Sequence, residues 1–268
     1  KELLPCMDKT RLTPPAKDLI AVLERNEWIH VPHYSYPFSV GMGKSVLSPI
    51  SGYTDKISDK TWLQIIRKND KKMTHHSWKE TATAYIEATH SEFSSSLSAQ
   101  AKKQPARFAK LSLRFPDNCF HAYISGVLQA LQHKDSPEEY ADIGLTCEVV
   151  RKYARSDNEY ILECIARVVE SRADEDWPVD ILQIVQNIAL LPITENSSRC
   201  VSKTEEKSAH ELYMSVLNSP QGSAIRTMTD LLFKKPDLLN YFKPTLSALS
   251  LLDEPFILLA LTDCTVAC

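Results

Sequence analysis

Apolar residues recur at spacings of three and four along most of the chain after residue 60. That spacing places side chains on one face of an α-helix, and the alternation typical of a strand is not sustained anywhere in this part. Prolines and helix-capping residues divide the pattern into segments. We predict helices at about 59–68, 77–103, 105–115, 118–132, 137–155, 158–171, 177–191, 207–218, 221–234, 236–250 and from 254 onward.

The stretch 217–224 is the clearest joint between two of these segments. Asn218 and Ser219 are residue types that cap helices, and Pro220 suits the first helical position. We expect Asn218 to cap the second helix and Gly222 to let the two helices approach closely. The joint then forms a tight turn between two packed helices.

Helices of this length joined by short turns favour antiparallel pairs that stack side by side. No internal sequence repeat is visible. We therefore predict an all-α fold, an irregular HEAT-like α-solenoid of antiparallel helix pairs with a loop-rich N-terminal segment. A compact helical bundle is the alternative.

We divide the chain into a loop-rich N-terminal segment, 1–60, and a helical-repeat domain, 61–268. The first segment holds a short predicted helix at 15–25, and 28–58 is rich in Pro, Ser, Tyr and Gly. Loops of this length in compact domains often carry function or wrap a neighbouring surface, and we expect the segment to pack on the helical body. The polar stretch 192–206 is a candidate disordered insertion.

The two ends of the sequence lead us to expect a fragment of a longer chain. The sequence lacks an initiator Met, and it stops just after the apolar run 256–261. The first six residues also lack the apolar core of a signal peptide.

The amino-acid composition limits which binding partners and which cellular compartment we expect. The chain has 6 Gly against 15 Pro, which suits long helices, and its net charge of −3 supplies no basic field for nucleic acid. No run of about 18 apolar residues is present, so we expect no membrane span. Seven Cys, an odd number with no CxxC pair, indicate reduced thiols packed as small apolar side chains. We therefore expect a cytoplasmic protein.

Two stretches approach known catalytic motifs and then depart from them. Residues 41–45 resemble the end of a phosphate-binding loop, but Phe38 stands where that loop needs a glycine. His210-Glu211 begins like a zinc-protease motif, but Met214 replaces the second His ligand. We interpret the first as a flexible loop and the second as a solvated helix start.

The remaining chemical clusters have structural interpretations. We expect His75-His76 to lie on the surface. The acidic run Asp174-Glu175-Asp176 should stabilise the start of the next helix rather than bind a cation. The pairs Lys102-Lys103 and Lys234-Lys235 should stabilise the C-terminal ends of helices. Cys264 and Cys268 lie one helical turn apart without a further metal ligand nearby. We expect Trp62, Trp78 and Trp177 to be packing residues. We assign no catalytic, cofactor-binding or metal-ligating residue and expect no cofactor.

Several short motifs nevertheless occur in a recognisable order. They are Ser48-Pro49-Ile50, Ser58-Asp59-Lys60-Thr61-Trp62-Leu63, Ile66-Arg67-Lys68-Asn69-Asp70, Gln104-Pro105-Ala106-Arg107-Phe108-Ala109, Tyr123-Ile124-Ser125-Gly126-Val127-Leu128, Trp177-Pro178-Val179-Asp180-Ile181-Leu182 and Leu217-Asn218-Ser219-Pro220-Gln221-Gly222-Ser223-Ala224. Together they resemble the helical-repeat region that follows the nucleotide-binding module of large bacterial STAND-type NTPases. The resemblance covers about residues 40–268.

The resemblance implies a sensor region. Some relatives act in antiphage defence, where such a region recognises a viral protein and an ATPase module elsewhere in the chain responds. We therefore expect a protein-binding scaffold that is not itself an enzyme. Its partner would be a protein, with phage proteins among the candidates, and self-association of the full-length protein stays open. The alternatives are an unrecognised enzyme that uses the 28–60 loop with His33, and a purely structural or oligomerisation module.

Overall fold

The computed structural model describes residues 13–15, 17–18, 45–68, 78–80, 84–132, 141–192, 216, 218–252, 257–258 and 260–261. The chain divides into two compact units, Lys1–Ser45 and Val46–Cys268. In the first unit, residues 14, 15, 17 and 18 are helical, at the start of the helix predicted for 15–25. The predicted polar insertion lies outside the described residues, except for its first residue.

The second unit is mostly helical over its described residues, as the sequence pattern predicts. Its α-helices are α2 (Asp59–Lys68), α3 (His90–Lys103), α4 (Pro105–Ser112), α5 (His121–Leu131), α6 (Ile143–Tyr153), α7 (Glu159–Ser171), α8 (Val179–Ala189), α10 (Pro220–Lys234) and α11 (Leu239–Ser250). Two 3-10 helices, η3 (Thr54–Lys56) and η5 (Pro236–Leu238), precede α2 and α11. None of the described helices is long and apolar enough to cross a membrane.

A small sheet corrects the prediction of one long helix over 77–103. Strands β1 (Ser45–Leu47), β2 (Trp78–Glu80) and β3 (Ala84–Glu87) lie in the order β1-β3-β2, and β2 and β3 pair antiparallel with Lys79 opposite Ile86. Aromatic and β-branched residues here favour strands. α3 starts only after Thr89, whose hydroxyl accepts a hydrogen bond from the Glu92 N–H at 3.3 Å. The residues Thr89-x-x-Glu92 match the capping-box sequence pattern, and the helical spacing of apolar residues over 77–103 did not reveal this start.

The start of α6 is a second correction. We predicted a helix from residue 137, but residues 141 and 142 are not helical. The Asp142 carboxylate accepts a hydrogen bond from the Leu145 N–H at 2.8 Å and caps a helix that begins at Ile143. A short polar side chain directly before an apolar helix face is the stronger start signal here, because it satisfies an otherwise unpaired backbone donor.

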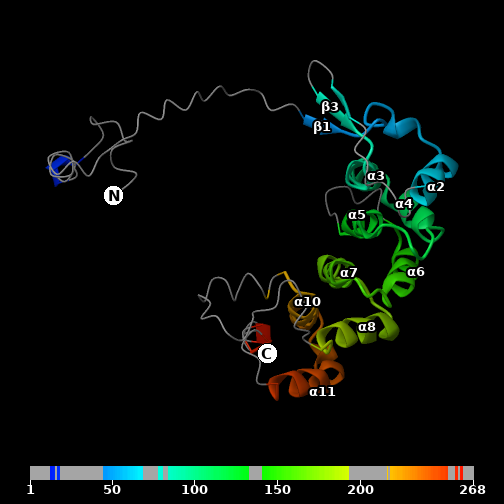
Figure 1. The fold of residues 1–268 in the computed structure, drawn as a ribbon. Helices are drawn as coiled ribbons and strands as arrows, with labels where there is room; N and C mark the ends of the chain where they lie inside the picture. The colour runs from blue at the N-terminus through cyan, green and yellow to red at the C-terminus, as the bar shows by residue number, and fades with distance from the viewer. Residues whose placement is uncertain are drawn as a thin grey trace. The chain divides into compact units, whose positions relative to one another are not determined.

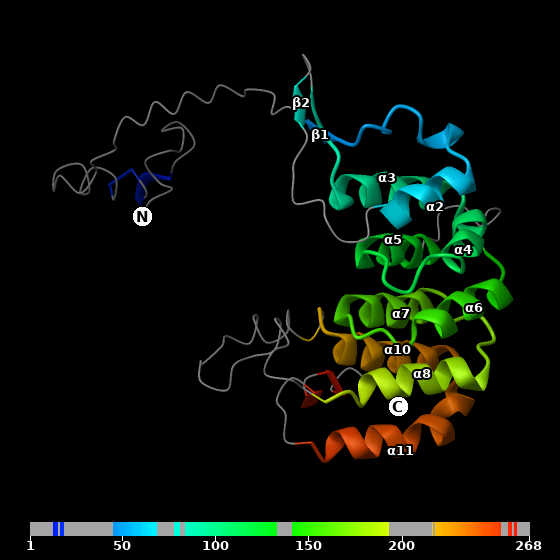
Figure 2. The same cartoon turned by 45° about the vertical axis from the view of Figure 1, so that its right-hand side comes forward.

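The helices of the second unit form two rows. In one row α3 contacts α5, α5 contacts α7, and α7 contacts α10; in the other, α4 contacts α6, and α6 contacts α8. Figure 1 and Figure 2 show α3, α5, α7 and α10 following one another beside the row of α4, α6 and α8. Helices therefore pack along each row, contacts such as those of α4 with α5 and of α8 with α10 join the two rows, and both rows bury their apolar faces in one continuous core.

Residues predicted to pack in the core do so where the structure describes them. Trp62 is fully buried and its ring meets Phe108 edge to face, with centroids 6.0 Å apart, and Trp177 is buried as well. Cys119, Cys147 and Cys164 are free thiols with buried side chains, as expected of cysteines that pack as small apolar residues. The other four Cys and the Trp78 side chain lie outside the described residues.

Part of the predicted N-terminal loop segment packs on the helices. The Ser48 hydroxyl lies 2.7 Å from the Ser96 hydroxyl of α3, and the Gln100 amide donates to Thr54 Oγ1 at 2.7 Å. Arg107 of α4 donates to the Ile57 carbonyl oxygen at 2.7 Å. These bonds hold residues 48–57 against α3 and α4.

Candidate functional site

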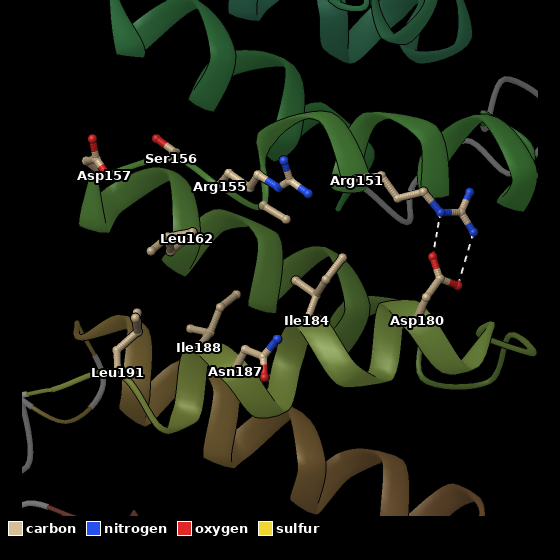
Figure 3. A pocket seen from close by; sticks show the side chains of 11 residues that line it. Arg151, Arg155, Ser156, Asp157, Leu162, Asp180, Ile184, Asn187, Ile188 and Leu191 are labelled. Atoms are coloured by element: carbon tan, nitrogen blue, oxygen red, sulfur yellow. Dashed lines mark hydrogen bonds and ion pairs between the residues drawn. The ribbon is translucent and has the colours of Figure 1, made fainter.

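A groove lies between the C-terminal end of α6, the turn that leads into α7, and α8. Its volume is about 540 Å³, which falls within the size range of small-ligand pockets. Figure 3 shows that the turn forms one wall and α8 the other. The lining side chains are Arg151, Ala154, Arg155, Ser156, Asp157, Leu162, Asp180, Ile184, Asn187, Ile188 and Leu191.

Local capping sets the shape of the wall formed by the turn. The Asn158 carboxamide oxygen accepts a hydrogen bond from the Ile161 N–H at 3.2 Å and so starts α7, close to the helix start predicted at about residue 158. The Ser156 hydroxyl accepts from the Asn158 N–H at 3.2 Å. These bonds fix the backbone of the turn, so that Arg155 and Asp157 project from an ordered loop.

The opposite wall comes from one face of α8. Ile184, Asn187 and Ile188 are spaced by three and one residues, which places them on one side of the helix, and Leu191 follows just after α8 ends at Ala189. Leu162 of α7 completes an aliphatic floor below the polar rim. The groove thus combines a water-accessible rim with apolar surface that a ligand can cover.

An ion pair closes one end of the groove. Arg151 Nε and Nη2 donate to the two carboxylate oxygens of Asp180 at 2.6 and 3.1 Å (Figure 3). These hydrogen bonds raise the pKa of Arg151 and lower that of Asp180. Since both side chains are about half exposed, the pair mainly fixes geometry and adds little stability.

Two charged side chains of the groove have no such partner. Within the described part of the chain, Arg155 and Asp157 make no hydrogen bond or ion pair through their side chains. Figure 3 shows Arg155 extending along the groove toward the Arg151–Asp180 pair, while Asp157 lies at the opposite end. The groove therefore offers one unpaired cation and one unpaired anion at different positions along its length.

Two shallower hollows lie on the other row of helices. Each has a volume of about 390 Å³. The hollow over α3 and α5 is lined by serines, Lys102, Gln129 and Tyr160, and the Gln129 amide donates to the Tyr160 hydroxyl at 2.6 Å. In the hollow over α7 and α10, Arg226 donates to both carboxylate oxygens of Glu170 at 2.8 and 3.1 Å. Arg226 and Glu170 thus pair with each other.

The acidic triplet 174–176 does not form a shared cation site. Asp174 pairs with Lys234 at 3.0 Å, Glu175 with Arg172 at 2.9 Å, and Asp176 with Lys235 at 2.5 Å. Lys234 and Lys235, predicted only to favour a helix end, thus join α10 to the turn before α8. Among the described residues, no group of three or more His, Cys, Asp or Glu side chains has a metal-binding arrangement.

Several candidates from the sequence lie outside the described residues. They are His33, the glycines and lysine of 41–44, His75-His76, His210-Glu211, and the pair Cys264 and Cys268. Ser45 is described and begins β1, whereas the matching residue of a phosphate-binding loop opens a helix. Because a helix N-terminus is needed to complete that phosphate site, the strand argues against the motif.

The groove itself was not predicted. Its charged residues come from α6, the turn after it and α8, and its apolar floor comes from α7, α8 and the residues just after α8, so no local motif joins them. The helical spacing of apolar residues on α8 was visible in the sequence, and Asn187 was the one polar residue on that face that could indicate a groove.

Neither a scan of protein-family models nor searches of curated proteins and of solved structures find a significant match to this chain.

Proposed function

We propose that this chain is a protein-binding helical-repeat scaffold, built as an irregular α-solenoid. The observation that carries the proposal is the stacking of α3, α5, α7 and α10 in one row beside α4, α6 and α8 in the other. Stacks of this kind present long surfaces that bind extended partners. The groove of Arg155 and Asp157 lies on such a surface, and its unpaired charges favour a polar partner.

We further propose that the scaffold is the sensor region of a bacterial STAND-type NTPase, with antiphage defence as its setting. The ordered motifs support this, and two of them contact each other. Arg107 Nε donates to Asp59 Oδ1 at 2.7 Å, and Trp62 packs on Phe108. Such contacts are expected of sequence motifs that together stabilise one fold. The segment itself then performs no chemistry, and partner binding shifts an ATPase module elsewhere in the chain toward its active state.

The experiment is site-specific photo-crosslinking of the full-length protein in bacterial cytosol, with and without phage infection. A photoreactive residue replaces Asn187 in the groove, and the matched control replaces Lys110, which is exposed on α4. We expect a discrete crosslinked partner protein from position 187 and a weaker or different pattern from position 110. Failure of every surface position to capture a protein overturns the binding function. A gene whose reading frame holds no Walker A and B pair overturns the STAND assignment.

A further inference from the structure

The two unpaired charges of the groove lie at different positions along its length. The Arg151–Asp180 pair neutralises itself, which leaves Arg155 as the unpaired cation and Asp157 as the unpaired anion among the lining residues. Figure 3 shows Arg155 extending toward the Arg151–Asp180 pair and Asp157 at the opposite end of the groove. A ligand with a negative group near Arg155 and a donor or positive group near Asp157 is therefore complementary to both ends.

The floor between these charges is aliphatic. Ile188 and Leu162 are buried, and Ile184 and Leu191 are partly exposed, so apolar surface reaches the solvent within the groove. Covering such surface contributes about 25 cal/mol for each Å² removed from water. Asn187 adds an exposed amide that both donates and accepts hydrogen bonds, which suits a peptide backbone.

We infer that this groove binds a short segment of the partner protein in which aliphatic side chains lie between a carboxylate and a basic group. The carboxylate meets Arg155, the aliphatic side chains cover Ile184, Ile188 and Leu162, and the basic group faces Asp157. The inference deepens the proposed function, on which it rests, by naming the chemistry of the segment.

The observations favour a carboxylate over a phosphate group. A single unpaired guanidinium faces the groove, and the Asp180 carboxylate occupies the second one, Arg151. Phosphate carries more charge than one exposed guanidinium neutralises, and no second unpaired guanidinium lines the groove among the residues that the structure describes. A carboxylate needs only the pair of parallel N–H donors that the Arg155 guanidinium presents.

The test uses two synthetic peptides, acetyl-Lys-Leu-Leu-Glu-amide and its uncharged match acetyl-Lys-Leu-Leu-Gln-amide. Each is titrated into the 268-residue chain carrying ¹³C-labelled Ile and Leu methyl groups, and NMR follows the methyl signals of Ile184 and Ile188. We expect the Glu peptide to shift these signals and to bind about three- to tenfold more tightly than the Gln peptide, as one exposed charge-assisted contact provides. Inorganic phosphate should leave the signals unchanged.

Three variants locate the contact. Arg155→Gln should bring the affinity for the Glu peptide down to that for the Gln peptide, and Arg155→Lys should retain part of the difference. Lys110→Gln, an equal loss of charge on exposed α4 surface, should change neither affinity. Both positions, Arg155 and Lys110, are exposed, so the folds of all three variants should remain intact, which their methyl spectra verify.

The outcomes separate the inference from the proposed function. Equal binding of both peptides, no shift at Ile184 and Ile188, or a phosphate-induced shift at these methyls overturns the inference. If the full-length protein still crosslinks a partner in any of these cases, the binding function stands and the segment lies elsewhere. If no partner is captured while the Glu peptide binds as expected, the groove chemistry holds and the scaffold function fails.

Discussion

The carbonyl oxygen of Val216 lies 2.1 Å from the point where a Cβ atom on residue 222 would stand. This carbonyl cannot move aside easily, because it accepts hydrogen bonds from the Ser219 N–H at 3.2 Å and from the Ser219 hydroxyl at 3.0 Å. Ser219 in turn caps α10 by accepting from the Gly222 N–H at 3.0 Å. The close approach at this joint is thus backbone against backbone, and Ser219 takes the N-cap position predicted for Asn218.

The first prediction concerns Gly222. Gly222→Ala should destabilise the fold by about 1–3 kcal/mol, because the new methyl group overlaps a carbonyl that is held in place, and the bulkier Gly222→Leu should cost at least as much. Urea unfolding followed by circular dichroism measures the change. Gly52→Ala is the matched control, since no atom lies within 4 Å of its Cβ position, and it should stay within about 0.5 kcal/mol of the original chain. Equal stability of the two Ala variants would remove the close-contact argument.

The second prediction concerns Lys152, which caps the C-terminal end of α4 from α6. Its Nζ donates to the carbonyl oxygens of Ser112, Leu113 and Phe115 at 3.2, 2.8 and 3.0 Å. Burial lowers the pKa of the ammonium group, so the charge stands in a partly desolvated site. Lys152→Met keeps the aliphatic stem but leaves the three carbonyl groups without this donor.

We expect Lys152→Met to lower the free energy of unfolding by about 1–3 kcal/mol, the usual effect of losing hydrogen bonds to a charged group. Thermal and urea unfolding both report it. Lys60→Met, at an exposed position in the first turn of α2, serves as the control and should change stability by less than about 0.5 kcal/mol. An unchanged free energy of unfolding in Lys152→Met would mean that water replaces the ammonium group without loss of stability.

The third prediction concerns alkaline pH. Burial raises the pKa of the Cys119 thiol from 9.0 to about 11 against the opposing charge of Lys152, and burial likewise raises the pKa of Tyr153. In the folded chain these groups keep protons that the unfolded chain releases. The contribution of Cys119 is therefore complete below pH 9 and is lost as pH rises toward 11, whereas that of Tyr153 begins to fall only above pH 10. Cys119 alone accounts for roughly 2–3 kcal/mol of that loss.

Cys119→Ala should therefore flatten the decline in stability between pH 9 and 11. Each protein is compared with its own stability at pH 7, which removes the separate effect of the lost sulfur atom. Urea unfolding at a series of pH values provides the measurement. Parallel curves for the two proteins would show that the thiol does not titrate differently on folding.

The fourth prediction concerns the acidic triplet. The hydrogen bond from Lys235 lowers the pKa of Asp176, although this carboxylate is fully exposed. Lys235→Met should return the Asp176 pKa to its ordinary range, as measured by NMR titration of the carboxyl carbon. Lys234→Met, which breaks only the pair with Asp174, should leave the Asp176 pKa low. Adding Mg²⁺ to the original chain should shift none of the three carboxyl signals; a joint shift would restore the cation-site interpretation.

Local signals in the sequence predicted most of the helices, because a helix is closed by bonds between residues four apart and by its own caps. The ends of α2, the start of α7 near residue 158 and Pro220 at the start of α10 all follow from such signals. The β2–β3 hairpin was missed, since strand register depends on cross-strand partners that periodicity does not report.

By itself, then, the sequence determined that this chain is mainly helical, where most of its described helices begin and end, and that its described tryptophan and cysteine side chains enter the core. Only the tertiary structure decided which distant side chains meet. Lys235 reaches Asp176 across 59 residues, and Arg155 comes to lie over the aliphatic face of α8. The physical reason is that caps and apolar faces are set within one or two helical turns, whereas ion pairs and grooves are set by how helices pack on one another.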